Sequence, residues 1–418
     1  MVLFYNLAIA IFSLLIRAVS PFHPKAKNFV TGRKGILKKV ETSLKGNKAP
    51  LVWIHCASLG EFEQGRPIIE ACKREYPAHK ILLTFFSPSG FEVRKDFSLA
   101  DYIFYLPWDT AKNARRFISA THPVLAIFVK YEFWFHYTRE LKKRHIPVLS
   151  VSSIFRKEQW FFKPQGSLLR KILSHFSHFF VQNHESVSLL HTIGLNNVTQ
   201  SGDTRFDRVR TILQRSEPIP VAEKFKNDQK VFVIGSCWPE DLDVLIPFIN
   251  ERKIKFIVAP HEITESTLKD FESALQVRSI RYSTALAEDP EEYDVLVIDN
   301  VGMLSRLYKY GEFAFIGGAY GKGLHNILEA ACYGIPILFG NRSYEKFQEA
   351  VDLINRGGAF AIHDYPDLKA KYEMLNVPES FLLACEVTRQ YVEENLGATE
   401  KIMQYCRAIL NKNIRVVL

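Results

Sequence analysis

Several short motifs that identify large enzyme classes are missing from this sequence. No glycine run has the spacing of the dinucleotide fingerprint, and none ends in the G-K-[ST] of the P-loop, so NAD binding and ATP hydrolysis are disfavoured. Glu265 stands where a zinc-binding H-E-x-x-H motif beginning at His261 would need its second histidine. The sequence also contains no internal repeat and no low-complexity segment.

Cysteine is scarce, and its spacing offers neither a metal site nor a redox pair. No C-x-x-C pair occurs among the six cysteines, which are Cys56, Cys72, Cys237, Cys332, Cys385 and Cys406. We expect small buried side chains in a reducing compartment, not disulfides or zinc ligands. Asp241 and Asp243 have D-x-D spacing, but two carboxylates so placed in a helix cannot easily face one ion, and we interpret them as solvated. The sequence therefore predicts no metal and no other cofactor.

The N-terminal apolar run is too short for a perpendicular membrane span. Residues 2–16 carry no charge, whereas such a span needs roughly 20 residues. Cations follow the run, at Arg17, Lys25, Lys27, Arg33, Lys34, Lys38 and Lys39, which is typical of anchoring at an anionic cytoplasmic leaflet. A cleaved signal peptide is disfavoured because no cation precedes the run and Pro21 follows the small residues 18–20. A buried first helix is the other alternative; we favour a membrane-docking helix over residues 1–20.

Length and charge suggest two domains and an anionic partner. A chain of 418 residues is too long for one ordinary core, and its 47% apolar and 24% charged residues are typical of a globular protein. The net charge of +9 suits an acidic lipid, a phosphorylated substrate or nucleic acid, although a modestly basic soluble protein would have it too. Nucleic acid is disfavoured because no RNA- or DNA-binding module is recognisable.

Short apolar runs alternate with helix-like segments in both halves, as in parallel sheets covered on both faces. The predicted strands are residues 51–57, 80–86, 102–106, 124–129, 146–151 and 178–182, then 230–234, 256–259, 295–298, 313–316, 335–339 and 359–362. Proline and charge mark residues 213–229 as a linker. We therefore predict an α/β protein with Rossmann-like domains at 21–212 and 230–418 whose strand ends face a cleft. Residues 378–410 read as helical, and the last helix is a candidate for packing back on the first domain.

The clearest ligand-binding pattern is the segment Gly317–Ala331. A predicted strand runs into several glycines and then into a predicted helix, an arrangement that lets backbone N–H groups approach a phosphate. We place His325 and Asn326 in the first helical turn and Glu329 one turn later, where it could bind ribose hydroxyls. The alternative, that the glycines only turn the chain tightly, leaves the grouping of these three polar residues unexplained.

Three further candidates follow predicted strands of the first half. Glu61, in Ser58–Pro67, could act as a general base on an acceptor hydroxyl, but Ser58 and Glu61 also have the spacing of a helix-capping box. Glu132 could orient an acceptor, or merely open a helix at the surface. Arg205, in Gly202–Asp207, could bind a phosphate through two hydrogen bonds, or form a structural pair with an aspartate. Spacing alone leaves Glu61 open and favours the structural alternative for Glu132 and Arg205.

Taken together, these segments resemble the 3-deoxy-D-manno-octulosonic acid (Kdo) transferases of lipid A synthesis. The resemblance covers nearly the whole chain, and the residues in its motifs are most similar to those of the Bacteroidetes branch. It runs through Pro21-Phe22, Gly32-Arg33, Ser58–Pro67, Thr84–Gly90, Tyr105–Pro107, Glu132–Trp134, Gly202–Asp207 and Gly317–Ala331. Such a resemblance implies a GT-B fold and an inverting transfer of Kdo from CMP-Kdo to a lipid A precursor. It also implies a peripheral or single-helix anchored protein at the cytoplasmic face of the inner membrane.

The resemblance also implies roles for individual residues. Glu61 would be the proton acceptor, and Glu132 and Arg205 would assist the transition state. CMP would be bound by Pro260, His261, Val301, Gly302, Met303, Asn326, Ile327, Leu328 and Glu329. The sequence departs from many relatives at Lys130, where they have Glu, at Arg205, where they have Lys, and at His261, where others have Arg. Two rival functions are another sugar-nucleotide enzyme, such as a UDP-sugar transferase or epimerase, and a non-catalytic membrane scaffold.

Overall fold

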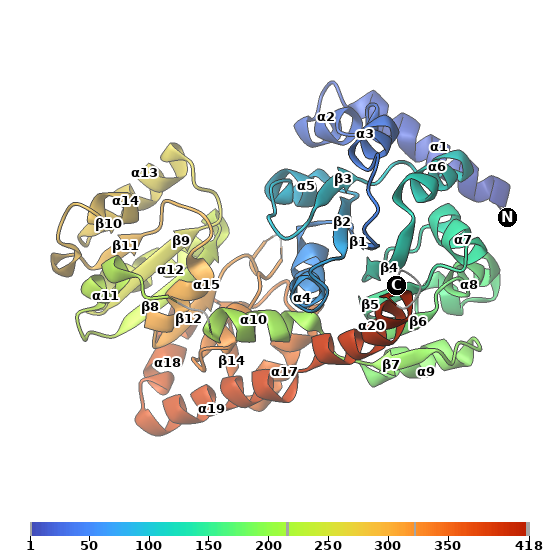
Figure 1. The fold of residues 1–418 in the computed structure, drawn as a ribbon. Helices are drawn as coiled ribbons and strands as arrows, with labels where there is room; N and C mark the ends of the chain where they lie inside the picture. The colour runs from blue at the N-terminus through green and yellow to red at the C-terminus, as the bar shows by residue number, and fades with distance from the viewer. Residues whose placement is uncertain (1, 215–216, 322, 415–418) are drawn as a thin grey trace. The chain divides into compact units, whose positions relative to one another are not determined.

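The computed structural model describes residues 2–214, 217–321 and 323–414 (Figure 1). Two compact units make up the chain. The first contains the described residues up to Arg208 together with those from Leu396 onward, and the second is Val209–Asn395. The first unit is therefore completed by a segment from the end of the chain.

The first unit is built on a seven-stranded sheet with the order β3-β2-β1-β4-β5-β6-β7, in which every neighbouring pair is parallel. Its strands are β1 (Leu51–Cys56), β2 (Lys80–Phe85), β3 (Tyr102–Tyr105), β4 (Pro123–Val129), β5 (Val148–Ser153), β6 (His178–Val181) and β7 (Val198–Gln200). Every residue of β1 is buried, as expected for a parallel strand covered on both faces.

Helices cover both faces of this sheet. They are α1 (Val2–Val19), α2 (Pro24–Thr31), α3 (Ile36–Ser43), α4 (Leu59–Glu75), α5 (Pro88–Arg94), α6 (Ala111–Thr121), α7 (Phe135–Lys143), α8 (Ser167–Leu173), α9 (His184–Thr192) and α20 (Ala398–Ile414). Val52 and Ile54 of β1 pack in the core shared with α4 and α20, whereas Trp53 packs on the opposite face with α6 and α7. Successive residues of the strand thus serve two separate cores.

The second unit repeats the architecture with the strand order β10-β11-β9-β8-β12-β13-β14, again entirely parallel. Its strands are β8 (Val231–Cys237), β9 (Lys255–Pro260), β10 (Ser279–Arg281), β11 (Val295–Val297), β12 (Phe313–Ile316), β13 (Ile337–Gly340) and β14 (Ala359–Ile362). Its helices are α11 (Pro220–Lys226), α12 (Pro239–Glu251), α13 (Glu265–Ala274), α14 (Tyr282–Ala285), α15 (Leu304–Leu307), α16 (Leu328–Ala331), α17 (Gln348–Arg356), α18 (Tyr365–Leu375) and α19 (Pro378–Glu394). The predicted α/β class with two parallel sheets is confirmed.

Each sheet has one point where the chain reverses its direction of winding. In the first unit this point lies between the neighbouring strands β1 and β4, and in the second between β8 and β12. Connections leave such a pair of strands towards opposite faces, which opens a crevice at their carboxyl ends, and ligands of α/β proteins bind there. The residues that follow these four strands are therefore the first place to look for a site.

The segment predicted to be a linker differs from that expectation. Of residues 213–229, positions 215–216 lie outside the described residues, and 220–226 form helix α11. Ala222 and Phe225 are fully buried, and the Ile219 N–H donates to the Tyr310 hydroxyl at 2.6 Å. These contacts place α11 in the second unit. From the sequence alone the proline at its start indicates a linker, but here it begins a helix with an apolar face.

Strands β7 and β10 are not among the predicted strands, and the stretch 378–410, predicted to be helical, contains a break. Both strands are only three residues long and lie at sheet edges. The stretch 378–410 splits into α19 and α20 around Gly397, which has a φ of +97° that ends a right-handed helix. Since α19 belongs to the second unit and α20 to the first, this break is also where the chain returns to the first unit.

Helix α1 is long and apolar enough to cross a membrane, by its length and composition. Its outer face exposes large apolar side chains, among them Leu3, Leu7 and Leu14, at 77%, 53% and 68% of full exposure. Its inner face is tied to the first unit, where the Tyr5 hydroxyl donates to Asp109 at 2.5 Å and Asn6 lies 2.6 Å from His136. The helix is thus attached to the unit along one side and apolar on the other.

Arg33 joins α2 to the ends of two strands. It follows α2, and its guanidinium is buried and donates to the backbone carbonyls of Phe29, Phe86 and Leu106, at 3.1, 2.5 and 2.9 Å. The cation also lies 3.8 Å from the centre of the Phe29 ring and 5.4 Å from that of Trp108. Burial lowers the pKa of Arg33 to about 9, so the group stays charged at neutral pH.

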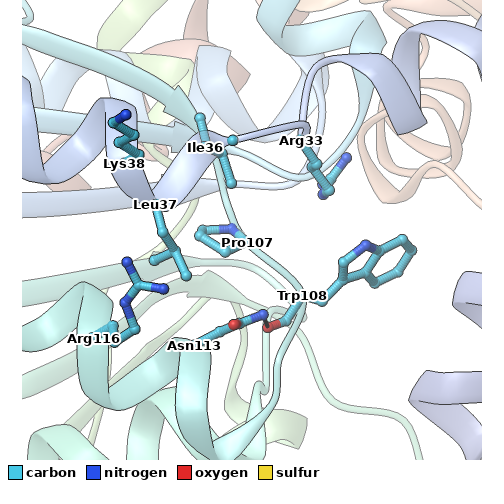
Figure 2. Close-up of a pocket in the computed structure, with 9 residues that line it drawn as sticks. Arg33, Ile36, Leu37, Lys38, Pro107, Trp108, Asn113 and Arg116 are labelled. Carbon is cyan, nitrogen blue, oxygen red and sulfur yellow. Dashed lines mark hydrogen bonds between the residues drawn. The ribbon is translucent and has the colours of Figure 1, made fainter.

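A surface cavity of about 300 Å³ lies beside this arginine. Figure 2 shows it between α3, α6 and the segment that follows β3, with Trp108 and Arg33 on one side and Leu37, Lys38 and Arg116 on the other. The labelled lining residues are Arg33, Ile36, Leu37, Lys38, Pro107, Trp108, Asn113 and Arg116. Arg33 therefore supports one wall of the cavity as well as the packing of α2.

Replacing Arg33 with methionine tests its structural role. The change keeps the length of the side chain but leaves three carbonyls without their donor, and we expect the free energy of unfolding to fall by about 2 kcal/mol. Urea unfolding measures the effect, and Lys34→Met, at the exposed neighbouring position, is the matched control. Equal stability of Arg33→Met and the wild type would contradict this role.

Candidate active site

Glu61 lies in the first turn of α4, directly after the carboxyl end of β1. Its Oε2 atom accepts a hydrogen bond from the hydroxyl of Ser58, the residue that precedes the helix. The Ser58 side chain makes no capping bond to the backbone of α4, so the full capping box does not form. The carboxylate is half-buried and oriented by Ser58, a suitable arrangement for a proton acceptor.

Glu132 follows the carboxyl end of β4, beside β1 in the sheet. Its Oε2 atom accepts hydrogen bonds from Trp134 Nε1 at 2.7 Å and faces His55 Nε2 at 3.1 Å. The Glu132 side chain is 13% exposed, and α7 begins only at Phe135. The alternative of a surface carboxylate that opens a helix therefore does not describe this residue.

The charges of both glutamates reach the same buried thiol. Cys56, the last residue of β1, is completely buried, and its pKa is raised by burial and by the charges of Glu61, Glu132 and Glu63. The pKa of Tyr131 is likewise raised, mainly by burial, with Glu61 adding to the effect. The fold thus brings Glu61 and Glu132, separated by some 70 positions in the sequence, to one edge of the sheet.

Arg205 forms the aspartate pair that the sequence left open. It lies in the first turn of α10 (Thr204–Gln214) and bonds to Asp203 through Nε at 2.9 Å and Nη2 at 2.8 Å. Asp203 also accepts hydrogen bonds from Gln64 and Gln182. Its pKa stays below the ordinary value because Arg205 and the hydrogen bonds outweigh burial, the largest single effect, which acts in the opposite direction. Arg205 is therefore held in a fixed orientation.

The candidate nucleotide residues of the second unit follow three strands of its sheet. Pro260 ends β9 and precedes His261, residues 301–303 lie between β11 and α15, and residues 326–329 lead into α16 after β12. Because the strands are parallel, all three segments lie at the same edge of the sheet. Val301 is 88% exposed, whereas Ile327 and Leu328 are buried.

Three aromatic rings stack at this edge. The ring of His261 lies 4.1 Å from that of Trp238 and 4.6 Å from that of His325, and Trp238 Nε1 donates to His325 Nε2 at 3.0 Å. Burial, with a smaller contribution from His261, lowers the pKa of His325 to about 4, so its ring is neutral at physiological pH. Since Nε2 accepts, the ring proton of His325 is on Nδ1. Flat rings of this kind can stack on a nucleobase.

The predicted helix after the glycines is shorter than expected. Helix α16 has only four residues, and His325 and Asn326 precede it instead of forming its first turn. An argument from a helix dipole therefore does not apply to this segment. A side chain at Gly317 would come within 2.4 Å of the Ser236 carbonyl oxygen, and Gly318 has a φ of +94°. Tight packing of the chain thus explains these two glycines, and Lys322 lies outside the described residues.

Asp241 was expected to be solvated, and this expectation is wrong. Its side chain is fully buried at the start of α12, where Oδ2 accepts the backbone N–H groups of Trp238 and Gly318, both at 2.8 Å. Burial, the dominant effect, raises the pKa of Asp241 to about 6. Asp241 therefore fixes the glycine segment to α12, while Asp243, on the same helix, is exposed as expected.

Other features of the site were not found from the sequence. His55, Trp134, Trp238 and Asp203 each bond to a candidate residue or stack with one. Trp134 and Asp203 lie within the segments 132–134 and 202–207 but were not named as partners of a candidate residue, whereas His55 and Trp238 lie outside the segments of the resemblance. The signal that could have found His55 is a histidine in an otherwise apolar strand, where a buried polar ring needs partners. All six cysteines are free and buried, as expected. Among the described residues, no group of three or more His, Cys, Asp or Glu side chains could hold a metal ion.

Comparison with solved structures identifies the fold. UDP-N-acetylglucosamine 2-epimerase from Neisseria meningitidis matches 87% of this chain and all of its own length, with a TM-score of 0.61 and 15% identity. A putative UDP-N-acetylglucosamine 2-epimerase from Listeria monocytogenes covers 88% of this chain and 98% of its own, with a TM-score of 0.58 and 14% identity. At such low identity the likeness concerns the fold alone, which is of the GT-B type.

Sequence comparison then gives the family. The model of the family described as 3-deoxy-D-manno-octulosonic-acid transferase matches residues 30–208. The 3-deoxy-D-manno-octulosonic acid transferase of Aquifex aeolicus is 31% identical over 344 residues, 80% of this chain and 88% of the relative. That of Haemophilus influenzae is 25% identical over 87% of this chain and 88% of its own. The molecule is a glycosyltransferase, and the chain belongs to the Kdo transferase family.

The titration of Asp241 predicts how stability depends on pH. Its pKa is about 6 in the folded chain against an ordinary value of 3.8, so between these values the folded chain binds more protons than the unfolded one. The contribution of Asp241 to the free energy of unfolding therefore falls as the pH rises through this window. In Asp241→Asn this fall disappears, and the loss of stability between about pH 4 and about pH 7 should shrink by roughly 2–3 kcal/mol.

Urea unfolding at the two pH values measures this difference. Asp243→Asn, in the exposed position two residues away, is the matched control and should retain the wild-type pH dependence. The interpretation of Asp241 would be wrong if Asp241→Asn lost as much stability as the wild type between the two pH values.

Proposed function

We propose that the protein is an inverting glycosyltransferase that moves Kdo from CMP-Kdo to a lipid A precursor in lipopolysaccharide synthesis. The observation that carries the proposal is the pair of glutamates, Glu61 and Glu132, at the crevice between β1 and β4 in a member of the Kdo transferase family. By their names, the structural neighbours act on UDP-sugars, but at such low sequence identity the likeness supports a common fold and not a common substrate.

In the proposed reaction, Glu61 takes the proton from a hydroxyl of the acceptor sugar. The hydroxyl oxygen forms a bond to the anomeric carbon of Kdo, while the bond between that carbon and the CMP phosphate oxygen breaks. The bonding electrons leave with CMP, and the anomeric centre is inverted. The hydrogen bond from Ser58 orients the Glu61 carboxylate, and Glu132 assists by stabilising positive charge on the sugar.

CMP is proposed to bind in the second unit. Its contacts are residues 260–261, 301–303 and 326–329, which follow three strands of one sheet, β9, β11 and β12. Stacking of Trp238, His261 and His325 supports this placement, because it provides flat rings at the same edge. Arg205, oriented by Asp203, is proposed to stabilise the charge that develops on the phosphate. No metal takes part in this scheme, and transfer should continue in the presence of EDTA.

We further propose that α1 docks the protein on the cytoplasmic face of the inner membrane. One side of this helix is attached to the first unit by Tyr5 and Asn6, and the other exposes leucines and phenylalanines. Exposed cations, including Arg17, Lys25 and Lys27, follow the apolar face and would contact anionic headgroups. Docking would bring the enzyme to an acceptor that is itself embedded in the membrane.

Replacing Glu61 with glutamine tests the proposed proton acceptor. Glutamine has nearly the same shape but cannot take a proton, so kcat should fall about 100-fold or more. The assay incubates the protein with CMP-Kdo and tetraacyl lipid A precursor and counts the added Kdo units by mass spectrometry. Stabilisation by CMP, measured as a rise in the melting temperature, should be unchanged.

Glu63→Gln is the matched control for this experiment. Glu63 lies on the same helix and pairs with Arg94 at 2.9 Å, so its loss should cost stability but little transfer. Wild-type transfer by Glu61→Gln would refute the role of Glu61. Transfer of a sugar from a UDP donor, without transfer from CMP-Kdo, would refute the proposed function as a whole.

The docking role of α1 is tested with the double variant Leu7→Ser and Leu14→Ser. Both side chains lie on the exposed side of α1, so binding to vesicles of phosphatidylglycerol and phosphatidylcholine should weaken about tenfold or more. Flotation with the vesicles measures binding. Leu382→Ser with Leu383→Ser, two leucines of α19 that are each 65% exposed, is the matched control and should float like the wild type. Equal flotation of both double variants would count against docking through α1.

A further inference from the structure

A chain of hydrogen bonds runs through the interior of the first unit and ends on Glu132. Trp53 Nε1 lies 2.8 Å from Thr84 Oγ1, which in turn lies 2.8 Å from His55 Nδ1. The other ring nitrogen of His55, Nε2, lies 3.1 Å from Glu132 Oε2, the atom that also accepts from Trp134. Trp53, His55 and Thr84 have no exposed surface, so each polar atom depends on these partners.

The donor and acceptor properties of these groups indicate which of them donates in each hydrogen bond. An indole N–H can only donate, so Thr84 Oγ1 accepts from Trp53 and has its own proton to give to His55 Nδ1. A neutral His55 that accepts at Nδ1 carries its proton on Nε2 and donates it to Glu132.

The opposite neutral tautomer is disfavoured by Glu132. With the proton on Nδ1, donated to the Thr84 carbonyl oxygen at 3.1 Å, Nε2 could accept from Trp134 Nε1 at 3.3 Å. It would then also face a carboxylate oxygen at 3.1 Å, lone pair against lone pair. Trp134 Nε1 lies closer to Glu132 Oε2, at 2.7 Å, so its proton is directed to the carboxylate and not to the ring. A doubly protonated ring would donate from both nitrogens. The geometry therefore favours Nε2 as a donor to Glu132.

The place of these hydrogen bonds in the sheet indicates what the His55 donor does. His55 and Thr84 are paired residues of the neighbouring strands β1 and β2, so the ring is held by the sheet itself. Trp134 and His55 both bind Oε2 of Glu132, and no bond to Oε1 occurs among the described residues. Two rigid donors on one oxygen fix the rotation of the carboxylate and present the other oxygen for contact with a substrate.

We infer that His55 is a positioning residue for sugar transfer: its Nε2–H orients the Glu132 carboxylate, and Thr84 and Trp53 fix the tautomer that makes this possible. The inference rests on the proposed function, because it requires Glu132 to assist the transition state. It goes beyond that function in assigning a role to a buried side chain that does not touch the substrate.

Two substitutions of His55 separate positioning from packing. In His55→Gln the amide nitrogen reaches the place of Nε2 and can still donate to Glu132, whereas in His55→Asn the shorter side chain reaches only the place of Nδ1. We expect His55→Asn to lower kcat about 10- to 100-fold, as for loss of a hydrogen bond to a charged group, and His55→Gln to restore most of that loss. The KM for CMP-Kdo should stay the same in both.

A double-mutant cycle with Glu132→Gln is the decisive measurement. If His55 acts through Glu132, His55→Asn should cost little further activity once Glu132 is glutamine. A purely structural role would instead make the two losses multiply. His79→Asn is the matched control, since His79 is 3% exposed and lies before β2, at the amino edge of the sheet. Its effect should multiply with that of Glu132→Gln.

The outcomes distinguish this inference from the proposed function. Wild-type activity in Glu132→Gln would refute the role of Glu132, whatever His55 does. A large loss in Glu132→Gln together with wild-type kcat in His55→Asn would refute the positioning role alone. Equal losses in His55→Gln and His55→Asn would also refute it. Should His55→Asn not fold, Trp134→Phe removes the other donor to Oε2, and the same cycle with Glu132→Gln decides whether orientation of this carboxylate matters.

Discussion

The burial of both faces of each parallel sheet is the constraint on which the rest of the molecule depends. In β1 every side chain from Leu51 to Cys56 is buried, so the strand offers no reactive group to solvent until it ends. Chemistry is therefore confined to the carboxyl edges, and within them to the places where the winding reverses, beside β1 and β4 and beside β8 and β12. A polar side chain inside such a strand must find partners there, which is why His55 and Thr84 bond to each other.

The same constraint explains which elements could be predicted from the sequence. Strands whose residues form continuous apolar runs were predicted, six in each half, close to where the structure has them, including the edge strands β3 and β14. The other two edge strands, β7 and β10, are short and covered less completely, so their sequences carry no comparable run. The break at Gly397 escaped prediction because a single glycine in a helical pattern is ambiguous until its φ is known.

Candidate site residues were predictable where they follow a strand, as were partners close in sequence, such as Ser58 and the aspartate beside Arg205, but distant partners were not. Glu61 and Glu132 could be found because each comes shortly after an apolar run, whereas His55 looks like an ordinary core residue. Its contact with Glu132 spans 77 positions and depends on the order of the strands, which no local pattern encodes. Asp241 was misjudged for the same reason: its second partner, Gly318, lies 77 positions away.

Helix α1 and the segment that carries Glu132 share a structural support. Helix α7 begins just after Glu132 and Trp134, and its first three N–H groups need acceptors from outside the helix. Tyr5 of α1 accepts the first at 3.3 Å, and Asp109 accepts the next two, from His136 and Tyr137. Since the Tyr5 hydroxyl also donates to Asp109, α1 and the start of α7 are held by one buried carboxylate, whose pKa burial raises to about 6. Two hydrogen-bonded side chains, Tyr5 and Asp109, therefore connect α1 to the helix turn that follows the segment carrying Glu132.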